Sequence, residues 1–393
     1  MFRQTGKRSR NRVRHALRAL GEMVFESYRL KTHRIYYIML IMKMTFRWYG
    51  DKDSIAISKI AQIPVIDGIV SAVYDVPAGE VWPEASIKKL KDQAESCNLK
   101  FEVVESVPVH EDIKLRAAGC DRLIDNYCEN IRRLSKYGIK VICYNFMPVF
   151  DWLRSEMARP LADGSNSLAY DEKTVLSLNP LTSNLSLPGW DESYTKAQLV
   201  ELLNRYRDVD EEKLWSNLEY FLKKIIPVCE ECDIKMAIHP DDPPWGIFGL
   251  PRIITDQKNL RRFLELVPSV YNGVTFCTGS FGAGQNNNLI EMIKLAQGRI
   301  HFAHIRNIRY TGERSFQESA HPTVCGSLDI FNIVKTLVET GFDGYVRPDH
   351  GRMIWGETGK YGYGLYDRAL GAMYLYGLFE AIQKQRGEPH HDV

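Results

Sequence analysis

Four short stretches in the second half of the chain each place a metal-ligating residue where an apolar run ends. The four residues are His239, Cys277, His304 and Asp349. Parallel strands of a barrel bring their carboxyl ends to one rim, so residues far apart in the sequence converge there. Two imidazoles, a thiolate and a carboxylate would hold a divalent transition metal and leave coordination positions open. The sequence therefore predicts a metal-dependent enzyme.

Each of these residues also has a structural interpretation when it is taken alone. Cys277 is apolar enough to be a core residue, although the Thr-Gly-Ser that follows it suits a chain turning at a rim. His301 competes with His304, but side chains three apart on a strand point to opposite sides, and His304 is nearer the carboxyl end. Asp343 precedes its strand and belongs at the opposite rim from Asp349. The joint occurrence on consecutive strands favours the metal site.

Short apolar runs alternate with amphipathic stretches from residue 47 onward. The runs predict seven strands, at 68–75, 99–106, 140–146, 235–239, 274–278, 300–305 and 344–348. The amphipathic stretches predict helices at 83–97, 120–137, 213–232, 256–267, 288–297 and 329–341. This alternation predicts an α/β fold of the TIM (β/α)8 barrel type. The eighth strand is expected after residue 351 or among segments without a clear pattern.

Two regions fall outside the repeating pattern. Residues 155–210 are polar and longer than an ordinary connection, which predicts an inserted cap region after the third strand. Residues 1–43 form a basic N-terminal extension, which we expect to be disordered or upstream of the true start at Met42 or Met44. Residues 44–393 then form a single catalytic domain.

Charge and cysteine content limit the possible partners and compartments. Residues 1–43 hold eleven Lys and Arg against two Glu, a net charge of +9, so the other 350 residues carry −7 in a chain of net charge +2. An acidic body argues against nucleic-acid binding. No apolar run reaches the length of a membrane span. Eight scattered cysteines fit free thiols in a cytoplasmic protein.

Several longer strings resemble the D-mannonate dehydratase family, from about residue 44 to the C-terminus. They include Trp48-Tyr49-Gly50, Gly79-Glu80-Val81-Trp82, residues 104–114 and 143–149, His239-Pro240-Asp241-Asp242-Pro243-Pro244, residues 250–253, Cys277-Thr278-Gly279-Ser280 and Arg347-Pro348-Asp349-His350-Gly351. The resemblance implies a barrel similar to xylose isomerase and dehydration of D-mannonate to 2-keto-3-deoxy-D-gluconate in hexuronate (glucuronate) catabolism. It also implies a divalent metal, typically Mn²⁺. The mixed ligand set itself suits Mn²⁺, Fe²⁺, Co²⁺ or Zn²⁺ rather than Mg²⁺ or Ca²⁺.

The proposed dehydration needs a general acid and a general base near the metal. The resemblance implies that His350 and Tyr363 form this pair. His350 is next to Asp349 and Tyr363 lies in a Gly-rich loop, and which of them is the acid and which the base is not assigned. Tyr361 and Tyr366 are nearby aromatic residues for which packing is the simpler interpretation.

Further polar residues at strand ends are candidates for substrate contacts. His110 and Asn145 end two predicted strands and would bind substrate hydroxyls, while Asp241 and Asp242 are expected to orient a ligand imidazole. A planar guanidinium can hold a carboxylate with two hydrogen bonds, and a surface role fits any one arginine equally well. The candidate arginines are Arg306, Arg347 and Arg352.

Three alternatives compete with this interpretation. A metal-dependent sugar isomerase or epimerase on the same barrel is the nearest, although a Cys ligand and the absence of Glu at the ends of the fourth and seventh predicted strands count against it. A metal-dependent DNA phosphodiesterase would need a basic groove. A non-enzymatic scaffold with a nucleic-acid-binding or membrane-binding basic head is the third. Barrels of this kind often pair through their helices, so a homodimer is the assembly we expect.

Overall fold

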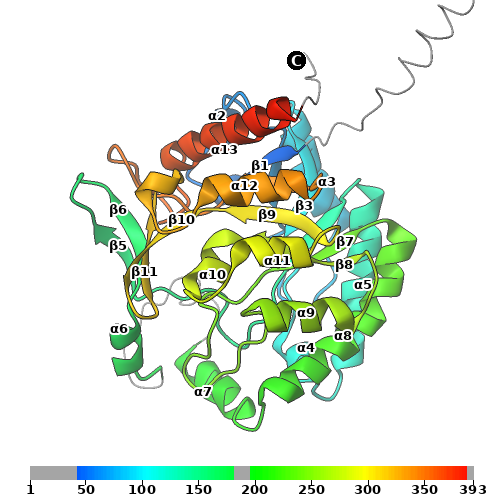
Figure 1. Cartoon of the computed structure of the whole chain (residues 1–393). Helices are drawn as coiled ribbons and strands as arrows, with labels where there is room; N and C mark the ends of the chain where they lie inside the picture. The colour runs from blue at the N-terminus through cyan, green and yellow to red at the C-terminus, as the bar shows by residue number, and fades with distance from the viewer. Residues whose placement is uncertain (1–41, 181–194, 387–393) are drawn as a thin grey trace, which may run out of the picture. The chain divides into compact units, whose positions relative to one another are not determined.

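Eight parallel strands close into a barrel in the computed structural model, which describes residues 42–180 and 195–386 (Figure 1). Their order around the barrel is β1-β12-β9-β8-β7-β4-β3-β2. The strands are β1 (Lys43–Arg47), β2 (Gly68–Ser71), β3 (Lys100–Glu105), β4 (Val141–Tyr144), β7 (Lys235–Ile238), β8 (Asn272–Cys277), β9 (Ile300–Ile305) and β12 (Tyr345–Pro348). The TIM barrel that the sequence predicts is confirmed.

The eighth barrel strand is β1, at the beginning of the described chain. Thr45 pairs with Gly68 of β2, and Met44 pairs with Val346 of β12, so β1 closes the barrel. The sequence pattern did not reveal this strand because it is short, carries Lys43 and Arg47 at its ends, and directly follows the basic N-terminal extension. The alternative position after residue 351 is wrong, because that segment leads into a helix, α13 (Tyr366–Gln385).

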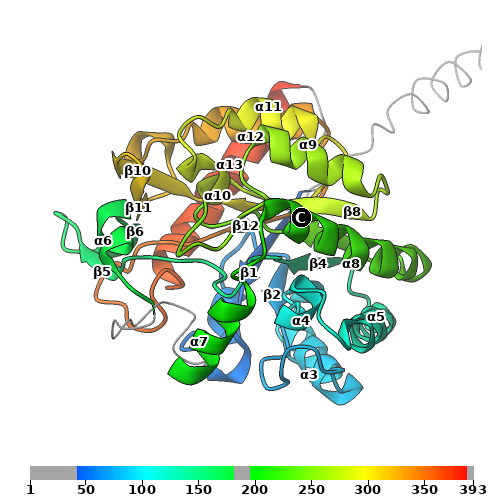
Figure 2. The same cartoon turned by 90° about the horizontal axis from the view of Figure 1, so that it is seen from below.

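The helices predicted between the strands are present and end within a few residues of the expected positions. They are α3 (Glu84–Glu95), α5 (Cys120–Lys136), α8 (Glu211–Cys232), α9 (Gln257–Leu266), α11 (Leu289–Leu295) and α12 (Ile330–Glu339), and they stand around the strands in Figure 2. Asp210, Asp256, Asn288 and Asp329 each cap the helix that follows by accepting a backbone N–H. Gly138 ends α5 with a φ of +81°, which favours glycine.

Several shorter helices lie in the connections. They are α2 (Ile57–Ile60), α4 (Glu111–Lys114), α6 (Glu172–Ser177), α7 (Lys196–Arg205), α10 (Thr278–Ala283) and the 3₁₀ turns η1 (Gly50–Lys52) and η2 (Thr323–Cys325). Among the described residues, no helix has the length and apolar character needed to cross a membrane.

A second, four-stranded antiparallel sheet lies beside the barrel (Figures 1 and 2). Its order is β10-β11-β6-β5, with β5 (Glu156–Pro160), β6 (Asn166–Tyr170), β10 (Asn307–Gly312) and β11 (Ser315–Ser319). The predicted insertion therefore contributes one hairpin, and the segment after β9 contributes the other. With β1 counted, the insertion follows the fourth barrel strand rather than the third.

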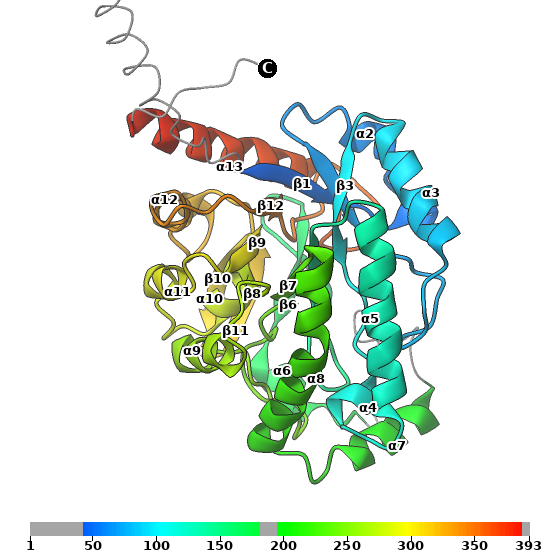
Figure 3. The ribbon, with the colours of Figure 1, turned by 90° about the vertical axis from the view of Figure 1, so that its right-hand side faces the viewer.

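Two apolar cores hold the barrel together. The inner core consists of inward-facing side chains from six of the strands, namely Val70, Val103, Val141, Cys143, Ala237, Phe302 and Tyr345. The outer core lies between the strands and the surrounding helices. Within it α5 and α8 pack side by side (Figure 3), with the Tyr127 and Phe221 rings edge to face at 5.1 Å between centroids. Strands buried on both faces explain the continuous apolar runs in the sequence.

Candidate active site

Three polar residues face one another across the carboxyl ends of neighbouring strands. Cys277 on β8 pairs with His304 on β9, and His304 pairs with Arg347 on β12. Residues paired in register on adjacent strands point to the same side of the sheet. His239 directly follows β7, and its ligand atom lies within 4.8 Å of those of Cys277 and His304. Three of the four predicted metal ligands therefore converge on one point.

The fourth predicted ligand, Asp349, borders this cluster. Its Oδ2 lies 3.4 Å from the Cys277 Sγ, and ion pairs join it to Arg347 at 2.8 Å and to Arg306 at 2.9 Å. Burial raises the pKa of Asp349, but the positive charges of Arg347 and Arg306 outweigh it and hold the pKa well below its usual range. Asp349 is therefore a carboxylate, the form that can ligate a cation.

Backbone contacts set the orientation of the His239 imidazole. Its Nδ1 lies 2.7 Å from the carbonyl oxygen of Pro240, which can only accept, so Nδ1 carries the hydrogen and Nε2 has a free lone pair. Asp241 instead accepts backbone N–H groups of Ile253 and Ile254, and Asp242 pairs with two arginines. The Pro240 carbonyl thus holds the position that the sequence prediction gave to an aspartate.

The competing residues lie away from the cluster. His301 is buried beside Gly273, where a side chain would lie 2.3 Å from its Nε2, and desolvation lowers the pKa of His301 to about 3. Asp343 is exposed and precedes β12. The choice of His304 over His301 follows from strand parity, because His304 shares the inward face with Phe302 of the inner core.

The predicted acid/base residues touch each other beside this cluster. The Nε2 of His350 lies 2.8 Å from the Tyr363 hydroxyl, and its Nδ1 lies 2.7 Å from Glu318 of β11. Burial raises the pKa of Tyr363 to about 12. The Tyr363 carbonyl accepts a hydrogen bond from Arg368 at 2.5 Å, which fixes the loop against α13. The pair is thus buried and held from both sides.

A cavity of about 220 Å³ opens over these groups. It is smaller than the roughly 300–1,000 Å³ of pockets for drug-sized ligands, so it suits a small metabolite. Its lining combines charged and aromatic side chains with both proposed catalytic residues. It is formed by Arg47, Tyr49, Glu105, Ser106, Cys143, Tyr144, Asn145, Met147, Asp151, Trp152, His239, Asp242, Arg347, Asp349, His350, Lys360 and Tyr363.

Two of the five predicted substrate contacts line this cavity, namely Asn145 and Arg347. Arg306 lies outside the lining, fully buried against Glu318, Asp242 and Asp349.

The other two predicted contacts also lie outside the cavity lining. The His110 Nδ1 caps α4 by accepting the Asp112 N–H at 3.0 Å. Arg352 pairs with Asp367 and Asp163, each at 2.8 Å. Strand-end position alone therefore did not separate cavity residues from structural ones.

Several cavity residues were not singled out from the sequence. Glu105 ends β3 and Arg47 ends β1, so the strand-end rule would have found both once β1 was recognised. Arg47 pairs with Glu105 at 3.2 Å, and Glu105 pairs with Arg347 at 3.1 Å. Glu318 lies in the second sheet, and no pattern in the sequence connects it to His350.

Comparison with known proteins agrees with this geometry. A family model described as D-mannonate dehydratase (UxuA) matches residues 42–388. A mannonate dehydratase of Thermotoga petrophila is 54% identical over 357 residues, which cover 88% of this chain and 99% of the relative. The crystal structure of mannonate dehydratase from Streptococcus suis serotype 2 superimposes with a TM-score of 0.83 at 47% identity, covering 89% of this chain and 97% of that one.

A more distant neighbour shares the fold alone. A xylose isomerase-like TIM barrel protein from Mycobacterium smegmatis in complex with magnesium has 12% identity and a TM-score of 0.54, covering 87% of this chain and 97% of that one. The high identity to mannonate dehydratases therefore decides for the dehydratase over the isomerase, phosphodiesterase and scaffold alternatives. The chain therefore belongs to the D-mannonate dehydratase family, and it is a hydro-lyase that acts on the sugar acid D-mannonate.

Proposed function

We propose that His239, Cys277, His304 and Asp349 hold the divalent metal on which this dehydratase family depends. The convergence of the first three within 4.8 Å is the observation that carries the proposal. Two further facts support the fit. The His304 Nε2 is buried and makes no hydrogen bond among the described residues, with the Glu105 Oε2 at 3.4 Å. The Asp349 Oδ2 lies 3.4 Å from the Cys277 Sγ, so the carboxylate borders the same point. A cation would use such lone pairs.

A second group of ligand atoms, from Glu105, Cys143 and His304, shares one imidazole with the first. Cys143 is the weaker thiolate candidate, because burial and the nearby Glu105 carboxylate raise the pKa of its thiol well above the usual value. We therefore assign the metal to the Cys277 side. Family resemblance favours Mn²⁺ as the metal, and the mixed thiolate, imidazole and carboxylate ligands also suit Fe²⁺ or Co²⁺.

The charges around the cavity suit an anionic substrate. Arg47 and Arg347 oppose Glu105 and Asp349, so the fixed charges balance. A divalent cation beside one thiolate leaves a single positive charge, which the substrate carboxylate neutralises. The Arg347 Nη1 makes no hydrogen bond among the described residues and is the donor we propose for this carboxylate, with Asn145 near the hydroxyls.

Dehydration of D-mannonate removes a proton from C2 and the hydroxyl from C3, and the resulting enol becomes the 2-keto acid. When bound, the divalent cation would stabilise the negative charge that develops on the substrate carboxylate. His350 and Tyr363 are the groups we propose for the two proton transfers, one taking the C2 proton and the other protonating the departing hydroxyl. Their 2.8 Å contact lets them exchange a proton between turnovers.

The experiment is a turnover assay on metal-stripped enzyme with D-mannonate. We expect 2-keto acid formation to return on addition of Mn²⁺, and to a lesser extent with Fe²⁺ or Co²⁺, in step with one bound metal per chain. Equal restoration by Mg²⁺ would contradict the thiolate ligand, because Mg²⁺ prefers oxygen ligands. Inactivity of folded, metal-loaded enzyme would contradict the proposed site.

Compartment and assembly complete the proposal. All eight cysteines lie in the described part of the chain and are free thiols, which supports a reducing compartment such as the cytoplasm. The homodimer and the substrate roles of His110, Arg306 and Arg352 stay predictions. Light scattering of the purified enzyme measures the assembly directly.

A further inference from the structure

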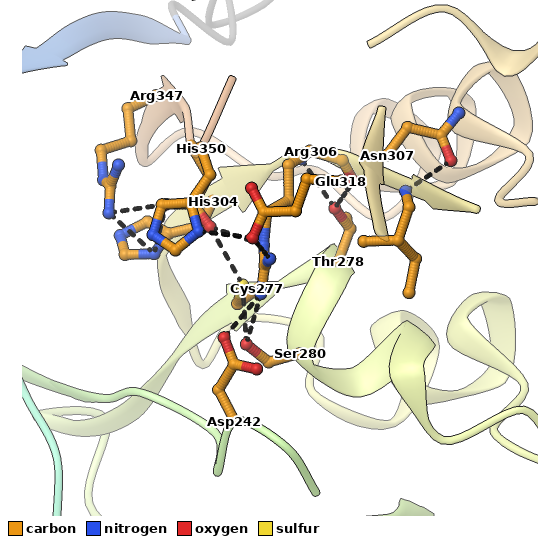
Figure 4. Close-up of polar contacts among 12 residues, drawn as sticks. Asp242, Cys277, Thr278, Ser280, His304, Arg306, Asn307, Glu318, Arg347 and His350 are labelled. Atoms are coloured by element: carbon orange, nitrogen blue, oxygen red, sulfur yellow. Dashed lines mark hydrogen bonds and ion pairs between the residues drawn. The ribbon is translucent and has the colours of Figure 1, made fainter. Parts of the chain in front are cut away.

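Glu318 reaches the active site from outside the barrel. It lies on β11 of the second sheet and is fully buried. Its Oε1 lies 2.7 Å from the His350 Nδ1, on the side of the ring opposite Tyr363 (Figure 4 shows the glutamate beside the imidazole). The imidazole is therefore held between a carboxylate and a phenol.

Two buried arginines fix the Glu318 carboxylate in this position. Arg154 donates to its Oε1 at 2.9 Å and Arg306 at 2.5 Å. Asp242 holds the same two arginines, at 2.9 Å and 2.7 Å. Gly279 permits the close approach of α10, since a side chain there would lie 2.2 Å from the Arg306 Nε. Glu318 thus has little freedom to move away from His350.

The protonation of these groups follows from their partners. Burial raises the pKa of Glu318, but the contact with His350 and the positive charges of Arg306 and Arg154 outweigh it, and the net pKa lies below the usual range. An ionised carboxylate can only accept, so the His350 Nδ1 must carry a hydrogen. In the tautomer with its hydrogen on Nδ1, the ring presents the Nε2 lone pair to the Tyr363 hydroxyl, which lies 2.8 Å away.

We propose that Glu318 is a positioning residue for catalysis: it fixes the tautomer and the ring orientation of His350, so that Nε2 can receive the Tyr363 proton. This inference rests on the acid/base role proposed above for the two residues. In the exchange the Tyr363 O–H bond breaks, an N–H bond forms at Nε2, and the imidazolium that results lies against the Glu318 carboxylate. The second sheet therefore takes part in the chemistry through one side chain.

The first test is Glu318→Gln, which keeps the shape of the side chain and removes its charge. The amide can donate to Nδ1 and so favour the wrong tautomer. We expect kcat to fall on the order of 10²- to 10⁴-fold, the range seen when a histidine loses its orienting carboxylate, while KM changes less than about threefold. Metal content should match the wild type.

Glu111→Gln is the matched control. Glu111 is also a buried carboxylate, paired with Lys114 at 2.6 Å and with the Tyr206 hydroxyl at 2.5 Å, and it does not line the cavity. Its substitution should lower thermal stability and leave kcat unchanged. Glu318→Asp covers the case in which the Gln variant fails to fold. The shorter side chain keeps a negative charge near the two arginines but moves the carboxylate away from the His350 Nδ1. That variant should also lose kcat with KM preserved.

A double-mutant cycle with Tyr363→Phe separates this inference from the proposed function. If Glu318 acts through the pair, its substitution in an enzyme that already carries Tyr363→Phe should cost far less than in the wild type. Independent, multiplicative losses would overturn the positioning role, as would full kcat in a folded Glu318→Gln enzyme. Full activity of Tyr363→Phe alone would instead count against the acid/base pair, and the inference would fall with it.

Discussion

The inward-facing side chains of the barrel form an apolar layer and, one strand repeat further on, a charged layer. Val103, Phe302 and Tyr345 lie in the apolar inner core, and two residues later the same strands present Glu105, His304 and Arg347. A spacing of two keeps side chains on one face of a strand. The side chains therefore change from apolar to charged over only two residues of each strand.

The two layers contribute to the enzyme in different ways. The apolar layer stabilises the barrel by burying surface, roughly 25 cal/mol per Å². The charged layer and its surroundings balance buried guanidinium groups against buried or nearly buried carboxylates, which are Arg47, Arg154, Arg306 and Arg347 against Glu105, Asp242, Glu318 and Asp349. Breaking one such pair leaves an uncompensated charge. The apolar layer below the site thus stabilises the fold, whereas the charged layer at the site carries the free-energy cost of burying charges.

The largest expected effect is on the metal site of the charged layer. Cys277→Ser should lose bound metal and turnover together, by more than the roughly 10–100-fold that loss of a ligand-orienting residue costs. Metal analysis and the D-mannonate assay on one preparation measure both. Cys97→Ser, at a half-exposed free thiol, is the control that should keep both. Full retention of metal and kcat would remove Cys277 from the site.

Next is the ionic network itself. Asp242→Asn leaves Arg154 and Arg306 short of a charge and should cost about 3–5 kcal/mol of unfolding free energy at pH 7. Burial raises the pKa of Asp242, but the charges of Arg154 and Arg306 outweigh this effect. The pKa of Asp242 therefore lies well below the ordinary value near 3.8. A depressed pKa gives stability that is present above the unfolded pKa and is lost as pH falls toward the folded one.

The difference between wild type and Asp242→Asn in urea unfolding should therefore shrink as the pH falls below about 4. A pH-independent difference would show that lost packing, not charge, dominates. Glu212→Gln, which breaks an exposed pair with Arg262, should have no measurable effect at any pH.

A smaller effect is expected one layer below. Val103→Ala removes two methyl groups from the inner core and should cost about 2–3 kcal/mol at every pH. kcat and metal content should stay at the wild-type values, since Val103 does not line the cavity. If this substitution released metal, the two layers would be mechanically coupled and the contrast between them would weaken.

The smallest effect is expected outside both layers. A chain that starts at Met42 should keep full turnover, since the family model begins at residue 42 and β1 begins at Lys43. Removing residues through Arg47 as well deletes β1 and should abolish folding, because β2 and β12 then lose their shared partner. Loss of kcat in the shorter deletion would assign the basic head a role in catalysis.

The barrel and the convergence of the proposed metal ligands were predictable for a common reason. Strands buried on both faces are continuous apolar runs, and their ends mark one rim, so the positions of His239, Cys277 and His304 follow from local patterns. Arg47 was missed with β1, whose short run merges with the basic head.

Glu318 was not predictable, because it lies on β11 of the second sheet and only the fold brings that strand against His350. Arg306 shows the converse error. It follows β9 directly, as a carboxylate-binding arginine would, yet its partners are Glu318 and Asp242, residues whose proximity only the fold reveals.

The pairing of β6 with β11 also bears on the order in which the enzyme acquires activity during folding. Arg154 and Glu318, which this sheet brings together, are separated by 164 residues in the chain. Loop-closure entropy delays contacts between segments so distant, whereas the helices and neighbouring strands form from local contacts. Arg154, which helps to fix Glu318 beside His350, reaches this carboxylate only when both hairpins have joined. A refolding chain should therefore regain its helical circular dichroism before it regains turnover.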